Sequence, residues 1–279
     1  MKYVILNADD FGSSSVANAA ILRAHQEGVL TSASLMVAGE AADEAIRIAR
    51  STPRLAVGLH VAVSDAPAAT AGRSSRLVER DGRLLANPAR VGLLLAVSRA
   101  CRDRAAEEVE EQFARFAASG LTFDHANGHQ HLHLLPAVWR PFVECCARYG
   151  VRWVRLPCEP FRPHRRARRA VRLAEHAFLR ALRSRCRADA DARGLRYAER
   201  VYGQLETGHM TAEYTSALIC RLEGQVAEVY FHPGTPHAQP LPGSDPPMDV
   251  ELHALLSREL RESLARSGRE ITAYGRILR

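Results

Sequence analysis

Hydrophobic and polar positions alternate along this chain between two kinds of segment. Short runs of apolar and β-branched residues, typical of buried strands, are separated by longer stretches in which apolar residues recur at helical spacing. The expected strands are residues 3–6, 31–37, 56–63, 121–124, 151–156, 201–205, 228–231 and 270–273. The expected helices are residues 14–27, 41–51, 104–119, 136–149, 167–187, 212–222 and 250–267.

This order of elements predicts the fold class. Alternating strands and helices indicate parallel strands joined by right-handed crossovers. With about seven or eight such units, a barrel fits better than an open sheet. We therefore expect one α/β domain over residues 1–279, built as a distorted (β/α) TIM-like barrel. Two segments rich in turn-forming residues, near residues 64–87 and 235–247, are expected to be loop insertions.

Composition changes this picture little. The formal net charge is +7, but Lys2 is the only lysine, so the excess of arginine reflects sequence bias more than a particular partner. Basic charge without a recognisable motif predicts no nucleic-acid partner. The first expected strand leaves no room for a signal peptide, and the longest apolar run, near residues 92–97, is too short to span a bilayer. The six cysteines lack regular spacing, so we expect reduced thiols and a cytoplasmic protein.

Arginine is concentrated in one segment, residues 163–187, which also carries an apolar stripe at helical spacing. Such a helix can pack its stripe against the barrel and expose a basic back to solvent. It can equally lie on an anionic lipid surface, which would bring the protein into peripheral contact with the inner face of the membrane. The sequence leaves both interpretations open, together with the oligomeric state, a homodimer included.

Polar side chains gather where the expected strands end, and this is the main functional signal. They are Asp9 and Asp10 after the first strand, His60 near the end of the third, His125, Asn127 and His129 after the fourth, Arg155 at the end of the fifth, and His232 after the seventh. Because the carboxyl ends of parallel strands meet at one face, these residues are expected to share one cleft.

A carboxylate and two imidazoles form a suitable ligand set for one divalent ion, which makes bound water acidic enough to attack an amide or ester. Each piece also has a simpler explanation. The two aspartates can form a turn and a helix N-cap, and His60 can be a core histidine. The run from His125 to His133 can be a surface histidine tract.

At these residues the chain resembles the YdjC-like carbohydrate deacetylases. The matching motifs are Asn-Ala-Asp-Asp-Phe-Gly at residues 7–12, Leu-Thr-Ser-Ala-Ser-Leu-Met-Val at 30–37, Val-Gly-Leu-His at 57–60, Gly-His-Gln-His-Leu-His at 128–133 and Tyr-Phe-His-Pro at 230–233. The resemblance implies a distorted barrel that holds one divalent ion.

The resemblance also implies a role for each site residue. Asp10, His60 and His129 would hold the metal, Asp9 would be the general base, and His232 the acid or transition-state stabiliser. His125 would contact substrate or support the ligands, and Arg155 would orient Asp9. Asn127 stands where many members have Asp, so it would support the metal or its ligands without a charge. Zn and Mg are the favoured ions, with Mn, Co and Ni left open.

The Asn variant, together with the segment Val-Arg-Leu-Pro-Cys-Glu-Pro at residues 154–160, resembles the hopanoid-biosynthesis-associated branch of these deacetylases. That resemblance implies a metal-dependent hydrolase that removes the N-acetyl group from N-acetylglucosaminyl bacteriohopanetetrol. The alternatives are a chitooligosaccharide deacetylase acting on diacetylchitobiose, a non-catalytic glycolipid-binding protein and, more distantly, a metal phosphoesterase.

Overall fold

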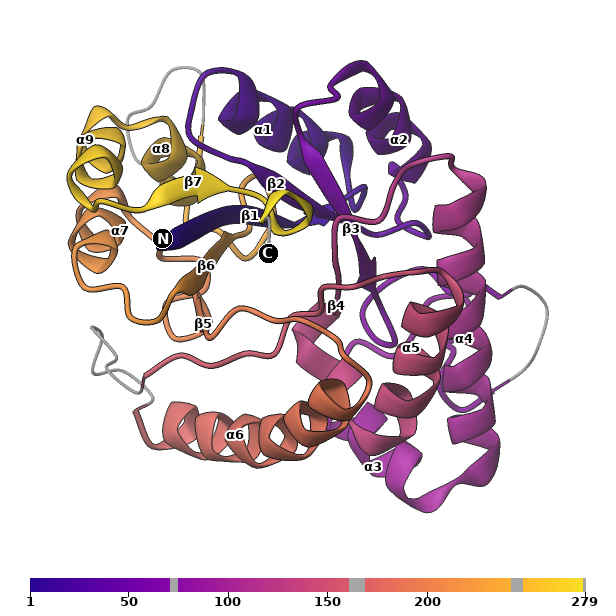
Figure 1. Cartoon of the computed structure of the whole chain (residues 1–279). Helices are drawn as coiled ribbons and strands as arrows, with labels where there is room; N and C mark the ends of the chain where they lie inside the picture. Colours follow the sequence, from indigo (N-terminus) through magenta and orange to yellow (C-terminus); the bar gives the residue numbers. More distant parts are fainter. Residues whose placement is uncertain (71–74, 161–168, 242–247, 278–279) are drawn as a thin grey trace.

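A curled sheet of parallel strands forms the core of the computed structural model, which describes residues 1–70, 75–160, 169–241 and 248–277. The strand order is β4-β3-β2-β1-β6-β5, with β7 paired to β1 (Figure 1). The strands are β1 (Tyr3–Phe11), β2 (Ser32–Leu35), β3 (Ala56–Val61), β4 (Ala126–Gly128), β5 (Arg200–Tyr202), β6 (Val226–Phe231) and β7 (Glu270–Thr272).

Strand β1 is the centre of the sheet. It pairs with β6 along one edge and divides its other edge between β7, opposite residues 3–5, and β2, opposite residues 7–11. Almost every residue of β1 and every residue of β6 is buried, because parallel strands are covered by helices on the outside and by packed side chains within. The long apolar run at the N-terminus therefore becomes the innermost strand.

The sheet curls toward closure through a segment that belongs to no regular strand. Backbone bonds join Ala126 to Trp153 and Arg155, and others join Val154 to Arg196 and Val201 to Cys158, so residues 152–158 lie between β4 and β5. The expected barrel is confirmed in this distorted form. The expected strand at residues 151–156 is wrong as a regular strand, because it makes only isolated bridges to its neighbours.

The strand expected at residues 121–124 is also wrong, since β4 begins only at Ala126. Phe123 is apolar for another reason: its ring packs against Phe116, with 4.2 Å between the ring centroids. As a result, Asn127 lies within β4, while His125 precedes that strand and His129 follows it.

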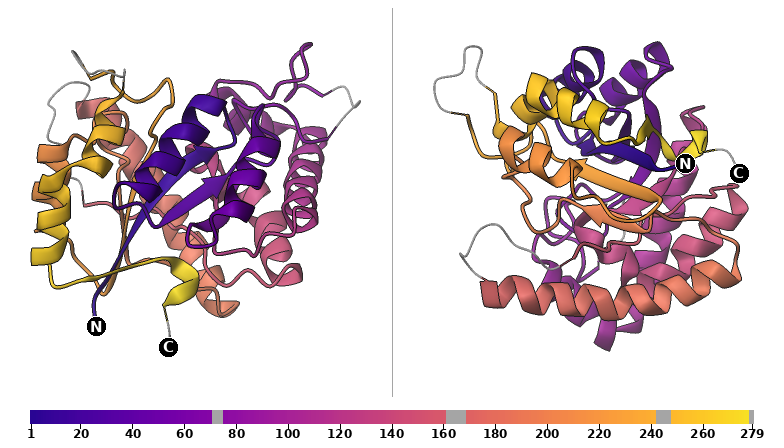
Figure 2. Two further views of the ribbon diagram at one scale, coloured as in Figure 1. Left: turned by 90° about the horizontal axis from the view of Figure 1, so that it is seen from above. Right: turned by 60° about the vertical axis from the view of Figure 1, so that its left-hand side comes forward.

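Helices surround the sheet on the outside, as the views in Figures 1 and 2 show. They are α1 (Ser15–Gln26), α2 (Ala42–Ser51), α3 (Pro88–Val97), α4 (Arg99–Ala118), α5 (Pro136–Arg148), α6 (Arg169–Ala192), α7 (Ala212–Ile219), α8 (Val250–Leu256) and α9 (Arg258–Arg266). The sequence did not predict α3, although Asn87 caps its first turn and Pro88 follows the cap. The single helix expected at residues 250–267 is two helices, because Ser257 ends α8 in an extended conformation and caps α9.

The segment expected to be an insertion near residues 64–87 contains no helix or regular strand in its described part. The one expected near residues 235–247 is likewise irregular as far as residue 241, and residues 242–247 lie outside the described residues.

The arginine-rich segment becomes α6, apart from residues 161–168, which lie outside the described residues. Leu179 and Leu182 pack against the core, whereas Arg180, Arg185 and Arg187 are exposed. The described half of the helix thus has an inward apolar stripe and a basic back, and lipid contact stays a prediction.

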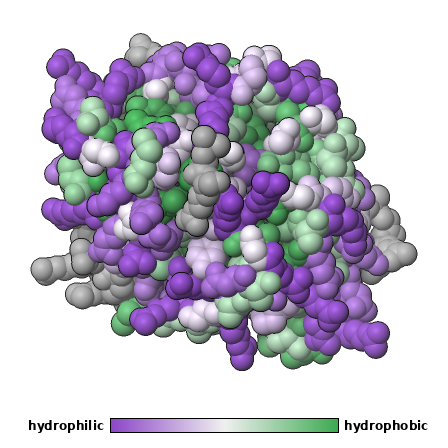
Figure 3. Space-filling model, in the orientation of Figure 1, coloured by the Kyte–Doolittle hydropathy of each residue, from purple (hydrophilic) through white to green (hydrophobic). Residues whose placement is uncertain are grey.

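On the face drawn in Figure 3, hydrophilic side chains predominate and hydrophobic ones form small patches between them. No helix among the described residues is both long and apolar enough to cross a membrane.

Candidate metal centre and active site

An irregularity in β1 turns two consecutive carboxylates toward the same site. Between Ala8 and Phe11 the register against β2 shifts by one residue, and Asp10 adopts a left-handed conformation with φ 62°. Successive residues of a regular strand point to opposite faces, and a bulge of this kind removes that alternation. The expectation that the pair follows the first strand is wrong, since β1 continues to Phe11. The aspartates do not cap α1 either, because Ser14 does so.

The three predicted metal ligands come together from β1, β3 and the turn after β4. Oδ1 of Asp10 lies 3.3 Å from Nε2 of His60 and 3.0 Å from Nδ1 of His129, and all three residues are buried. Two ligands bound about 2.0–2.2 Å from the same ion are about 3.0–3.5 Å apart, so the spacing suits one metal ion. One carboxylate and two imidazoles also match what zinc and related divalent ions prefer.

Burial of Asp10 would by itself raise the pKa of its carboxyl, but His129 and His60 beside it hold that pKa well below its usual range. Asp10 is therefore ionised, as a ligand must be. His129 reaches this position through an unusual turn, the 3₁₀ segment η1 (His129–Leu134), in which Gln130 and His131 both have positive φ. Strained backbone of this kind is often associated with functional sites.

Asp9 lies beside the triad and is held by a buried arginine. Arg155 binds both of its carboxylate oxygens, at 2.5 and 2.9 Å, and Asn7 donates to Oδ1 at 2.9 Å. Burial would raise the pKa of Asp9, but the Arg155 guanidinium, together with His60 and His232, holds that pKa far below its ordinary value. Arg155 therefore fixes the orientation of Asp9 and keeps it ionised.

Arg155 itself is balanced by a carboxylate that sequence reasoning missed. Its Nη2 donates to Glu228 at 2.6 Å, and Tyr274 donates its hydroxyl hydrogen to the same carboxylate at 2.5 Å. Glu228 is a charged residue in the otherwise apolar run of β6, and this contrast was the signal that could have identified it.

His232 follows β6 and completes the site. Burial lowers the pKa of its imidazole, against the opposite pull of Asp10 and Asp9, so His232 is neutral around pH 7. Its backbone N–H donates to the buried carboxylate of Glu251 at 2.5 Å, a second supporting residue that the sequence did not reveal. Nδ1 of His232 has no hydrogen-bond partner among the described residues.

The sequence of this chain matches known proteins over almost its whole length. Residues 3–266 match the family model for YdjC-like proteins. The chain belongs to the YdjC-like family. It is 31% identical to the carbohydrate deacetylase of Mus musculus over 97% of this chain and 93% of the mouse protein. It is also 35% identical to the chitooligosaccharide deacetylase of Serratia marcescens, over 53% of this chain and 56% of the other.

Among solved structures, the chain resembles a protein from Enterococcus faecalis whose assigned role is cleavage of cellobiose phosphate. The TM-score is 0.68 at 20% identity, over 98% of this chain and 97% of the other. This likeness shows the fold alone.

In this YdjC-like chain, Asn127 lies behind the triad, between His60 and Arg155. One end of its amide is 2.6 Å from Nδ1 of His60, and the other is 3.0 and 3.2 Å from the two terminal nitrogens of Arg155. The amide oxygen of Asn127 can face either Nδ1 of His60 or the guanidinium of Arg155, but not both. If it faces Arg155, the amide nitrogen donates to Nδ1, so Nε2 of His60 carries the proton and cannot bind a metal. If it faces His60, Nε2 is free to be a ligand, but the amide nitrogen meets the guanidinium.

We expect Asn127→Asp to tighten binding of the divalent ion about tenfold or more, because a carboxylate can accept from both His60 and Arg155. Isothermal titration of the metal-free protein with Zn²⁺ measures this. The control is Gln225→Glu, which adds the same charge just before β6, at the end of that strand that is far from His232. Unchanged or weaker Zn²⁺ binding by Asn127→Asp would contradict the interpretation.

His125, the last of the predicted site residues, is fully buried and does not line the cleft at the site. Its Nε2 meets Oγ of Ser34 at 3.0 Å, and the same hydroxyl meets Asn127 at 2.9 Å. A side chain at residue 58 would collide with the His125 ring, which explains glycine there. His125 thus supports the site through Ser34.

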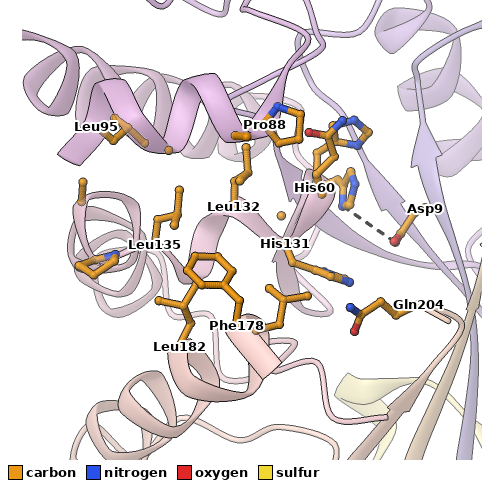
Figure 4. A pocket seen from close by; sticks show the side chains of 18 of the residues that line it. Asp9, His60, Pro88, Leu95, His131, Leu132, Leu135, Phe178, Leu182 and Gln204 are labelled. Carbon is orange, nitrogen blue, oxygen red and sulfur yellow. Dashed lines mark ion pairs between the residues drawn. The ribbon is translucent and has the colours of Figure 1, made fainter. Parts of the chain in front are cut away.

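The site opens into a cleft of about 1020 Å³. Its inner end is lined by Asp9, His60, His129 and His232. Beyond them, His131 binds the Tyr230 hydroxyl group at 3.1 Å, and Gln204 lies on the facing wall (Figure 4). The polar groups at this end can bind the hydroxyl groups of a sugar.

Proposed function

We propose that this chain is a metal-dependent carbohydrate deacetylase that hydrolyses the N-acetyl group of an N-acetylglucosamine-containing substrate to acetate and a free amine. The arrangement of Asp10, His60 and His129 next to the Arg155-bound Asp9, at the inner end of a cleft, is the observation that carries the proposal. The names of the mouse and Serratia marcescens relatives agree with this chemistry.

A divalent ion held by the three ligands would polarise the acetamide carbonyl and acidify the attacking water. Asp9 accepts the proton of that water, because Arg155 keeps its carboxylate ionised and aimed at the site. The neutral resting state of His232 favours the second of its two expected roles, in which its N–H donates to the oxygen that gains negative charge. The proton held by Asp9 can then pass to the departing amine, which balances the reaction.

For the substrate, we propose N-acetylglucosaminyl bacteriohopanetetrol, with diacetylchitobiose as the alternative. The apolar lining of the outer cleft favours the lipid-linked sugar, because a second sugar needs polar partners. A glycolipid substrate would also place the enzyme at the cytoplasmic face of the membrane.

Acetate release from both compounds tests this proposal. We expect turnover of the glycolipid to exceed that of diacetylchitobiose, to stop on addition of a chelator, and to return when Zn²⁺ or Mg²⁺ is restored. Turnover that resists the chelator would exclude the metal mechanism. Binding of the glycolipid without acetate release from either compound would instead favour a non-catalytic glycolipid-binding protein.

A further inference from the structure

The cleft continues well beyond the space that one sugar needs. Its volume of about 1020 Å³ is at the upper limit for sites that enclose a drug-sized molecule. The outer half runs between α3, the start of α5 and α6, away from the carboxylates and histidines of the inner end (Figure 4). A substrate whose acetamide reaches Asp9 therefore extends its other end between these helices.

The outer half differs sharply in chemistry from the inner half. Its walls are formed mainly by aliphatic and aromatic side chains: Leu95, Leu132, Leu135, Phe178, Leu179 and Leu182. Among the described lining residues of this half, Arg102 is the one charged side chain, and its guanidinium donates to the carbonyl oxygens of Leu95 and Ala96, each at 3.1 Å. The outer half thus offers few polar groups to the hydroxyls of a second sugar.

Two of the lining side chains are unusually exposed for their type. Leu93 of α3 is 64% exposed and Phe178 of α6 is 56% exposed, and both line the cleft. Exposed apolar side chains at the walls of a cleft are typical of surfaces that bury apolar area when a ligand binds. They lie on two different helices, so a ligand between α3 and α6 would cover both.

We infer that the outer half of the cleft is a subsite for an apolar, lipid-type aglycone, attached to the sugar whose acetamide lies at the metal centre. This inference rests on the proposed deacetylase activity. Each methylene group that becomes fully buried contributes up to about a fourfold gain in binding. Selectivity between glycosides therefore arises between α3 and α6, at a distance from the catalytic groups.

Methyl and octyl glycosides of N-acetylglucosamine test the subsite, with octyl glycoside kept below the concentration at which it forms micelles. We expect kcat/KM of acetate release to be about tenfold or more higher for the octyl compound, with the gain in KM rather than in kcat. Equal values for the two glycosides, or a marked preference for diacetylchitobiose over the octyl compound, would overturn the inference.

Two matched pairs of variants locate the effect. Phe178→Ser and Leu93→Ser remove apolar lining, whereas Leu173→Ser on α6 and Val97→Ser on α3 change side chains that are 50% and 69% exposed and do not line the cleft. The lining variants should lose most of the preference for the octyl compound and keep their activity on the methyl compound. The controls should keep both. Equal losses in a lining variant and its control would also overturn the inference.

The two failures can be told apart. If no glycoside releases acetate, the proposed deacetylase activity is wrong. If the methyl compound and diacetylchitobiose are turned over but the octyl compound gains nothing, the activity stands and only the apolar subsite is wrong.

Discussion

Replacing Asp9 with asparagine is expected to lower kcat for acetate release by about a thousandfold, because an amide cannot accept the proton of the attacking water. The substitution keeps the size of the side chain, and Arg155 still has Glu228 as a partner. Binding of Zn²⁺, measured by isothermal titration, should change little, since Asp9 is not one of the three proposed ligands. Acetate release near the wild-type rate would contradict the role of Asp9 as base.

Asp10→Asn is the informative comparison for that experiment, because it should give the opposite pattern. Loss of the carboxylate that we propose as a ligand should weaken Zn²⁺ binding strongly and remove turnover with it. Asp43→Asn, at an exposed position in the first turn of α2, controls for loss of a negative charge and should leave both properties unchanged. Identical behaviour of the Asp9 and Asp10 variants would show that the two carboxylates do not have separate roles.

Replacing Arg155 with methionine is expected to lower the free energy of unfolding at pH 7 by about 3–5 kcal/mol. Arg155 is fully buried between the carboxylates of Asp9 and Glu228, so its removal leaves two buried negative charges without a counterion. Urea denaturation measures the loss. Arg185→Met, at an exposed position on α6, is the control and should change stability by less than about 0.5 kcal/mol.

The size of this loss should depend on pH. Arg155 lowers the pKa of Asp9 in the folded protein, so the stability that this pair contributes is present above the ordinary pKa of an aspartate and is lost as the pH falls below it. In the variant, burial without the guanidinium raises the pKa of the Asp9 carboxyl, which favours its neutral form in acid. The difference between wild type and variant should therefore shrink from pH 7 to pH 4. A difference that is constant over this range would contradict an electrostatic role for Arg155.

Much of the fold could be predicted because the signals were local. Buried parallel strands need continuous apolar runs, and helices need apolar residues at helical spacing, so β1, β3, β6 and most helices lay near their predicted positions. The errors arose where tertiary contacts outweighed the local pattern. Phe123 is apolar because it packs on Phe116. The apolar residues within 151–156 are buried because this segment lies between two strands, although it pairs with its neighbours only through isolated bridges.

The site was predictable in its residues but not in its organisation. Asp9, Asp10, His60 and His232 could be identified because each follows an apolar run or lies near its end, and His129 because it belongs to a run rich in histidine. Their partners could not be identified in this way. Glu251 of α8 accepts a hydrogen bond from the backbone N–H of His232, and Tyr274, near the end of the chain, donates to Glu228. Such pairings depend on the spatial order of the strands, which no local pattern contains.

The sequence by itself determined that a parallel barrel would bring two adjacent aspartates and several histidines to one face, since strand direction and the position of each residue in its strand are local properties. The resemblance implied different roles for the two aspartates, but only the tertiary structure shows the physical cause of that difference. The bulge in β1 turns Asp10 toward His60 and His129, while the buried Arg155 holds Asp9, because backbone register and the pairing of buried charges depend on neighbours distant in the sequence. The apolar outer cleft was likewise decided by how α3, α5 and α6 pack, since none of these helices shows it alone.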